Sequence, residues 1–215
     1  MWGAAWLHQH CGDGPTTQAR AEAAITLATE EGFTANLPIF RICWGWALAE
    51  QGHLEAAITE MSQGLADYRA VEAKNLIPYH LALFGEVYGK AGQIAEGFTA
   101  IAEALAAVGI TGERTHEAEL YRLKGTLTLQ SKVQGPKSKV EEEAEECFQK
   151  AIKIARRQQA KSLELRATVS LARLWQQQGK HCKAHKMLSE IYNWFTEGFD
   201  TKDLQEAKAL LQELA

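Results

Sequence analysis

Proline, long apolar runs and paired cysteines are all scarce in this sequence. Only four of its 215 residues are proline, and Ala, Leu, Glu, Gln and Lys dominate, so helix is favoured nearly throughout. No apolar run approaches the ~20 residues that a membrane-spanning helix needs. The four cysteines form no Cys-x-x-Cys pair, which fits a reducing cytoplasm better than a disulfide framework. These features predict a helical, cytoplasmic protein.

Strong charge and the common catalytic motifs are also lacking. The net charge of −4 is too small to indicate nucleic acid or a membrane as the partner. The charge is uneven, since residues 1–110 carry 5 Lys or Arg against 12 Asp or Glu, and residues 111–215 carry 18 against 15. This asymmetry could orient a partner, or it could reflect ordinary solvated helix faces. The sequence has no Gly-x-x-x-x-Gly-Lys-Ser/Thr phosphate loop and no Gly-x-Ser-x-Gly elbow, so we expect no catalytic residue, cofactor or resident metal.

What the sequence does contain is a triplet of residues that recurs about every forty positions. A small residue, a large one four positions later and a small or apolar one three further on would share one face of a helix. The five copies are Ala21, Ile25 and Ala28; Ala57, Met61 and Gly64; Gly97, Ile101 and Ala104; Ala144, Phe148 and Ala151; and Ala184, Leu188 and Ile191. A fixed period of this size is typical of a helical solenoid, a class that binds partners far more often than it catalyses.

Two kinds of glycine follow the same period. Gly52, Gly92 and Gly179 precede three of the triplets and predict turns between paired helices. Gly45 and Gly85 lie inside the first helix of a pair, each twelve residues before its triplet. A glycine in a helix costs ~1 kcal/mol relative to alanine. Its recurrence at one position therefore predicts that the two helices of a pair approach too closely there for a side chain.

The pattern predicts an all-α, right-handed α-α superhelix of five hairpins, each made of a helix A and a helix B. We expect the repeats at residues 1–36, 37–76, 77–114, 115–160 and 161–198 of a single solenoid, and a capping helix over residues 201–214 with Leu204, Ala207, Leu210 and Leu211 on its buried face. In the fourth repeat, extra residues around Gly135-Pro136 predict a long, mobile loop between helices A and B. The acidic run 141–146 is expected to begin helix B, where carboxylates complement the helix dipole. The first repeat lacks the start of its helix A, which predicts that the chain is the C-terminal part of a larger protein.

The repeat resembles the tetratricopeptide repeat, in which helix A carries a large residue, a glycine and a tyrosine, and helix B carries Ala, Phe and Ala. Phe84, Gly85 and Tyr88 match helix A. Segments 118–125, 155–167, 170–179 and 194–201 are similar to the C-terminal repeats of large bacterial signalling proteins. Those proteins join a class III adenylate/guanylate cyclase domain to a predicted AAA-type or NB-ARC-like ATPase. The resemblance implies a non-enzymatic, protein-binding scaffold in signal transduction.

The inner face of the A helices is the expected binding surface for a protein or peptide, including another domain of the parent protein. Positions counted from the glycines place these residues on it: Ile39, Ile42, Trp46, Tyr79, Glu86, Lys90, Glu119, Arg122, Arg166, Arg173 and Gln177. The three arginines could bind a partner's carboxylate or phosphate, or they could pair with glutamates of neighbouring repeats. A chaperone-type carboxylate clamp is not expected, because Ile42 and Trp46 hold positions where it needs Lys and Asn.

Three other interpretations compete with this scaffold. A self-association module could stack through the open first repeat. His181 and His185, one helical turn apart, could share a metal, but they lack the Glu of a His-Glu-x-x-His motif and a local fourth ligand, which favours two exposed histidines. The tryptophans could stack nucleic-acid bases, but their positions favour packing between helices instead. The tryptophans concerned are Trp44, Trp46, Trp175 and Trp194.

Overall fold

The computed structural model describes residues 2–71, 75–131 and 137–215, and every regular element in these ranges is a helix. The first helices are α1 (Trp2–His10), α2 (Gly14–Glu30), α3 (Leu37–Glu50), α4 (Leu54–Ala70) and α5 (Ile77–Lys90), with a short 3-10 helix at Thr34–Asn36 before α3. The others are α6 (Ile94–Thr111), α7 (Glu117–Gln130), α8 (Lys137–Gln158), α9 (Lys161–Gln177), α10 (His181–Tyr192) and α11 (Lys202–Glu213). The all-α prediction is confirmed.

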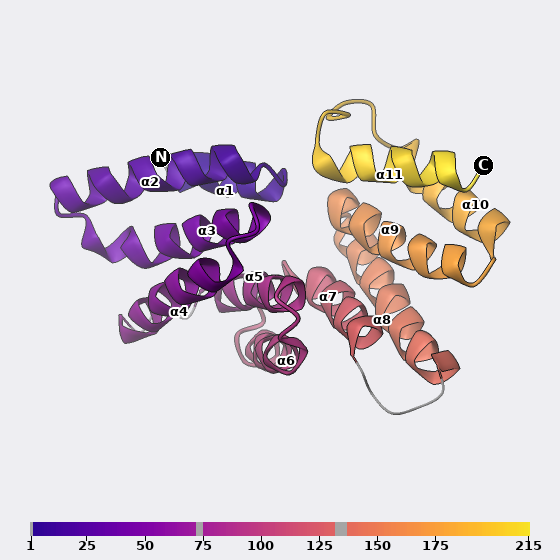
Figure 1. Ribbon diagram of the computed structural model, residues 1–215, viewed down its shortest axis with the longest axis horizontal. Coiled ribbons are helices and arrows are strands. Elements are labelled where there is room, and N and C mark those ends of the chain that lie inside the picture. The colour runs from indigo at the N-terminus through magenta and orange to yellow at the C-terminus, as the bar shows by residue number, and fades with distance from the viewer. Residues whose placement is uncertain (1, 72–74, 132–136) are drawn as a thin grey trace. The chain divides into compact units, whose positions relative to one another are not determined.

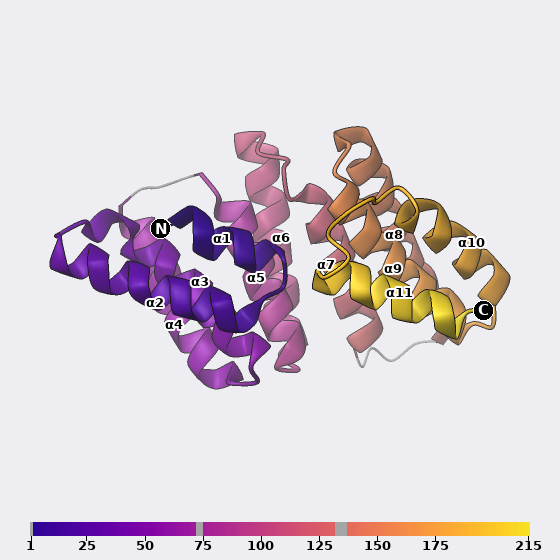
Figure 2. The same cartoon turned by 90° about the horizontal axis from the view of Figure 1, so that it is seen from above.

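The helices form two compact units, Met1–Glu103 (unit 1) and Ala104–Ala215 (unit 2). Within each unit, helices that follow one another in sequence pack side by side (Figures 1 and 2). Alternate helices also touch, α1 with α3 and α3 with α5 in unit 1, and α7 with α9 and α9 with α11 in unit 2. This second set of contacts is the packing expected of helical repeats. The number of repeats and the handedness of a superhelix remain predictions.

In three hairpins, a glycine of helix A contacts the central residue of the triplet in helix B. The central large residue of a triplet, buried in α4, α6 and α8, packs against the glycine of the preceding A helix. A Cβ atom added to these glycines would lie 2.5 Å from Met61 Cγ at Gly45, 2.5 Å from Ile101 Cδ1 at Gly85 and 2.6 Å from Phe148 Cε1 at Gly125. Real Cβ atoms do not approach so closely. The predicted close approach of helices A and B is therefore confirmed.

Glycine also makes the turns between helices A and B. Gly52, Gly92 and Gly179 have φ angles of 87°, 71° and 74°, in the left-handed region that glycine adopts without a steric penalty. Gly12, between α1 and α2, adopts the same conformation with a φ of 74°. The sequence pattern predicted three of these four turns.

The fourth hairpin differs from its prediction at the start of helix B. Helix α8 begins at Lys137, so Glu141 to Glu146 lie beyond its first turn and not at its N-terminus. The dipole effect is confined to the first turn, so it cannot explain these carboxylates. Some of them contact neighbouring elements instead, since Gln178 Nε2 donates to Glu141 (2.9 Å) and Lys180 lies 3.9 Å from Glu145. Residues 132–136 of the predicted long loop lie outside the described residues.

The last helix, α11, packs against α9 and α10. Leu204, Ala207 and Leu210 are buried at this contact, and Leu211 is half-buried. Thr201 occupies the N-cap position, and its hydroxyl donates to the carbonyl oxygen of Gly198 at 2.7 Å. The predicted capping helix is therefore present with its apolar face covered.

Helix α6 is more apolar than the sequence pattern led us to expect. Among the described residues it is the one helix whose length and composition would suffice to cross a membrane, with a mean hydropathy of 1.4. The core helix of a soluble protein passes the same test. In this chain α6 supplies the buried residues Gly97, Ile101 and Ala104 of the third triplet, which explains part of its apolar character.

Candidate functional site

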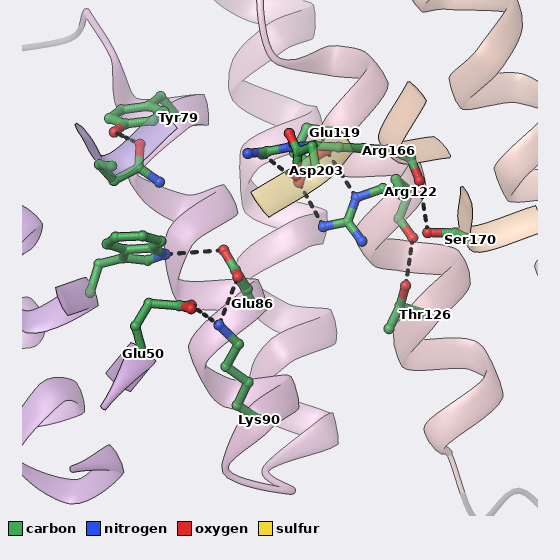
Figure 3. A network of polar contacts seen from close by, with 12 residues as sticks. Glu50, Tyr79, Glu86, Lys90, Glu119, Arg122, Thr126, Arg166, Ser170 and Asp203 are labelled. Atoms are coloured by element: carbon green, nitrogen blue, oxygen red, sulfur yellow. Dashed lines mark hydrogen bonds and ion pairs between the residues drawn. The ribbon is translucent and has the colours of Figure 1, made fainter. Parts of the chain in front are cut away.

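In unit 1, the predicted inner-face residues of α3 and α5 contact one another. Trp46 and Glu86 each follow the recurring glycine by one position, and Trp46 Nε1 donates to Glu86 Oε2 at 3.2 Å. Glu50 and Lys90 each follow it by five positions and form an ion pair. Lys90 Nζ also donates to Glu86 Oε1 at 2.8 Å. These four residues, here called the unit 1 cluster, thus join equivalent positions of two successive A helices (Figure 3).

The unit 1 cluster has a net charge of −1. Burial disfavours the charged ammonium of Lys90, but Glu86 and Glu50 outweigh burial and raise its pKa above the usual value. Lys90 therefore stays protonated between two carboxylates. The Lys90 and Glu86 side chains keep 34% and 26% of their surface exposed, whereas Trp46 is only 3% exposed. Glu86 and Lys90 are thus accessible to a ligand, and Trp46 supports them from the core.

Tyr79, another predicted inner-face residue, is also buried. Its hydroxyl donates to Gln9 Oε1 at 2.7 Å, and its ring stacks on His10 with centroids 5.5 Å apart. The Trp6 ring meets Tyr79 edge-on at 6.2 Å. Because only 3% of Tyr79 is exposed, it ties α5 to α1 and offers little surface to a ligand.

In unit 2, the predicted residues Glu119, Arg122 and Arg166 form a network that extends to Asp203 of α11. Arg122 Nη2 and Nε donate to the two oxygens of Glu119 at 2.6 and 3.0 Å. Arg166 of α9 lies 3.7 Å from the same carboxylate and donates through Nε to Asp203 at 2.7 Å. We call Glu119, Arg122, Arg166 and Asp203 the unit 2 cluster (Figure 3). It connects α7, α9 and α11 in succession.

Glu119 is ionised within this cluster despite its burial. Burial opposes the charged carboxylate, but the guanidinium groups of Arg122 and Arg166 outweigh it and lower the pKa of Glu119 to about 2. The Glu119 side chain is 9% exposed and that of Arg122 is 17% exposed. Removing either partner would leave a charge with little access to water, so this cluster is a fixed part of the fold.

Of the remaining predicted residues, Ile42 is fully buried and Ile39 half-buried in α3, whereas Arg173 and Gln177 lie at the surface of α9. Arg173 Nη2 approaches Glu206 of α11 at 3.3 Å, with 54% and 43% of the two side chains exposed. Gln177, one turn further along, is also exposed. An exposed ion pair of this kind contributes only about 0–1 kcal/mol. Arg173 is therefore the arginine that a ligand can reach and recruit at least cost.

The three arginines do not form an uncompensated basic patch. Arg122, Arg166 and Arg173 face Glu119, Asp203 and Glu206, so the charges balance. Of the two alternatives that the sequence left open, the pairing within the fold is what the structure contains. Sequence reasoning missed Glu50, Asp203 and Glu206. The pair Glu50–Lys90 had a usable signal, because opposite charges stand forty residues apart, the length of one repeat.

The other candidate residues lie apart from these clusters. His181 is exposed at the start of α10 and His185 is half-buried, and the parts of the chain that are described hold no group of three or more His, Cys, Asp or Glu able to bind a metal. Trp175 is 4% exposed, as core packing predicts, and Trp44 is half-buried. The prediction for Trp194 is wrong: it is 57% exposed, because α10 ends at Tyr192 and Trp194 falls in the following turn, where its ring is approached by the ammonium group of Lys161 at 5.6 Å.

No protein-family model matches this chain, and no curated protein shows significant similarity to it.

Proposed function

We propose that this chain is a non-catalytic, tetratricopeptide-like scaffold that binds a protein or peptide along the inner surface of its A helices. The contact of side chains from successive A helices carries the proposal. Glu86 and Lys90 in unit 1 are held by neighbours on α3, and Arg166 in unit 2 is held by α7 and α11. Charged groups fixed in this way lose little conformational freedom on binding, which favours recognition of a partner by either unit.

The exposure of each residue indicates which of them would meet the partner. Arg173 and Gln177 are exposed on α9, and Lys90 and Glu86 are partly exposed on α5. A partner carboxylate would replace Glu206 on Arg173 with little loss, because that ion pair is open to solvent. The resemblance to the repeats of bacterial cyclase–ATPase proteins supports a role as the interaction end of a bacterial signalling ATPase or nucleotide cyclase.

Binding to a peptide array tests the proposal. The wild-type chain is compared with a double variant, Arg173→Ala with Gln177→Ala, which removes two exposed inner-face side chains. Arg157→Ala removes an exposed arginine from a helix B and serves as the matched control. We expect acidic peptides to be retained by the wild type and by the control, and lost by the double variant. Equal binding by all three proteins, or no reproducible binding at all, would refute the inner-surface site.

Arg173 is a safer position for this test than Arg122 or Arg166. Replacing Arg122 or Arg166 removes a guanidinium that pairs with Glu119, whose carboxylate has little access to water. Such a variant could lose binding because it unfolds and not because it lacks a contact with the ligand. Glu206, in contrast, is well exposed and remains hydrated when Arg173 is removed. Far-UV circular dichroism and the urea midpoint should therefore be unchanged in the double variant.

Self-association is a second candidate, favoured by an apolar side chain on α1. Leu7 is 60% exposed, and it would be covered if two copies stacked through the first repeat. Sedimentation velocity over a wide concentration range decides the matter. A dimer that dissociates in Leu7→Lys would support it, and a strict monomer at every concentration would exclude it.

A further inference from the structure

Unit 1 contains a cavity of about 440 Å³ between α4, α5 and α6. Its floor is apolar and buried, formed by Leu65 of α4, Leu81 and Phe84 of α5, and Ala100 of α6, with exposed fractions of 3–7%. The ring of Tyr88, tilted against Phe84 at a centroid distance of 5.8 Å, completes it. The cavity is open to solvent on one side, and its volume leaves room for more than one apolar side chain.

The cavity lies on the opposite side of α5 from the inner-face residues. A helix turns by about 100° per residue. Leu81, Phe84 and Tyr88 are therefore directed about half a turn away from Glu86 and Lys90. A ligand in the cavity would leave the unit 1 cluster untouched, and the cavity is a separate surface from the one proposed above.

The rim of the cavity is polar, with a surplus of negative charge. Arg69 of α4 and Glu103 of α6 form an ion pair across it, and their side chains are 46% and 50% exposed, so the pair is easily exchanged. Glu96, also at the rim, is exposed and makes no ion pair with any residue in the described ranges. Residues 1–103, the whole of unit 1, carry 5 Lys or Arg against 12 Asp or Glu. The surrounding field thus attracts cations.

We propose that this cavity binds a basic segment of a partner protein, which inserts two apolar side chains and sets Lys or Arg against Glu96 and Glu103. A buried apolar floor within a polar rim is the arrangement found at the centres of protein interfaces. Two apolar residues three or four positions apart on a helical segment lie on one face and would enter the cavity together. Flanking cations would meet the rim carboxylates, and one of them would take the place of Arg69.

A peptide selection on the whole chain tests this assignment. A phage-displayed library of random short peptides is selected against the wild-type protein, and the enriched peptides are synthesised and measured by fluorescence anisotropy. We expect a family with net positive charge and two apolar residues three or four positions apart. Enrichment of acidic peptides alone, or of none, would overturn the proposal.

Two pairs of variants locate the site. Ala95→Trp fills the mouth of the cavity from an exposed position, and Ala56→Trp adds the same side chain at an exposed position of α4 away from it. Glu96→Lys reverses a rim charge, and Glu55→Lys makes the same change in the first turn of α4. The cavity assignment requires loss of binding in Ala95→Trp and roughly tenfold weaker binding in Glu96→Lys.

The matched controls distinguish binding in the cavity from a general effect of charge and from binding at the inner surface. Ala56→Trp and Glu55→Lys should bind basic peptides like the wild type. If Glu55→Lys weakens binding as much as Glu96→Lys does, the effect is one of net charge and the cavity is not the site. If Ala95→Trp binds basic peptides as tightly as the wild type does, they bind elsewhere on the chain and the cavity proposal fails.

Discussion

Replacing Gly45 by alanine should destabilise the protein, whereas the same replacement at Gly109 should stabilise it. Both glycines lie within helices, Gly45 in α3 and Gly109 in α6. A Cβ at Gly45 would stand 2.5 Å from Met61 Cγ and 2.9 Å from the carbonyl oxygen of Ala57. At Gly109 nothing lies within 4 Å. The two sites therefore differ in packing and not in secondary structure.

The expected magnitudes follow from two opposing effects. Alanine in place of glycine favours a helix by about 0.8–1.0 kcal/mol, and Gly109→Ala gains this amount. At Gly45 the added methyl overfills a packed contact, which costs about 1–3 kcal/mol, and the backbone oxygen of Ala57 allows little relief. Gly45→Ala should thus lose up to about 2 kcal/mol net. Gly85→Ala should fall between them, because there the closest atom is the Cδ1 tip of Ile101.

Urea unfolding followed by far-UV circular dichroism measures these differences. A repeat protein can unfold in stages, so the tryptophan fluorescence transition is recorded as a test of two-state behaviour. The predicted order of stability is Gly109→Ala above wild type, then Gly85→Ala, then Gly45→Ala. A Gly45→Ala variant as stable as Gly109→Ala would show that helices A and B do not touch at the glycine, and the recurrence of glycine at this position would need a different cause.

Three further predictions concern ionisable and exposed groups. The pKa of Glu119 falls to about 2 on folding from an ordinary value near 4.5, so the stability that its ionisation provides is present above pH 4.5 and is lost as the pH falls toward 2. Glu119→Gln should therefore be less stable than the wild type at pH 7 by about 3 kcal/mol, and it should lose less stability between pH 4.5 and pH 2. An acid transition identical to that of the wild type would contradict this prediction. Burial raises the pKa of the Cys43 thiol to about 12, so in native protein at pH 8 iodoacetamide should modify exposed Cys182 well before Cys43, as mass spectrometry would show; equal rates would contradict the burial of Cys43. Acrylamide should quench less of the total fluorescence in Trp194→Phe than in wild type, because Trp194 is 57% exposed; an unchanged quenching curve would mean that Trp194 is covered.

The elements of the fold follow largely from local sequence. The turns at Gly52, Gly92 and Gly179 were predicted where they occur, and so was the last helix, which begins after Thr201. These signals are local, since φ preference, capping and helical periodicity depend on residues within a turn or two. The close contact at Gly45 was also predictable, because the two helices of a hairpin are joined by a short turn and must pack face to face.

The candidate site was predictable in position but not in its interactions. The period placed Glu86, Lys90 and Arg166 on one face of the A helices, and the structure brings each of them to a partner from a neighbouring helix. The sequence period could not show that Trp46 and Tyr79 are buried, because the same helix face includes both buried and exposed positions. The depth of a side chain depends on how adjacent A helices pack.

A periodic, helical chain with glycine at its closest contacts was predictable from short stretches of residues, because periodicity and turn chemistry depend on residues near one another in the chain. Which charges meet depends on how distant helices pack. Arg166 and Asp203 are 37 residues apart in the sequence, whereas Glu50 and Lys90 are 40 residues apart. The two intervals differ because loops of unequal length join the helices. The cavity of unit 1 likewise combines side chains from three helices, and its volume is set by their packing and by no single segment of the chain.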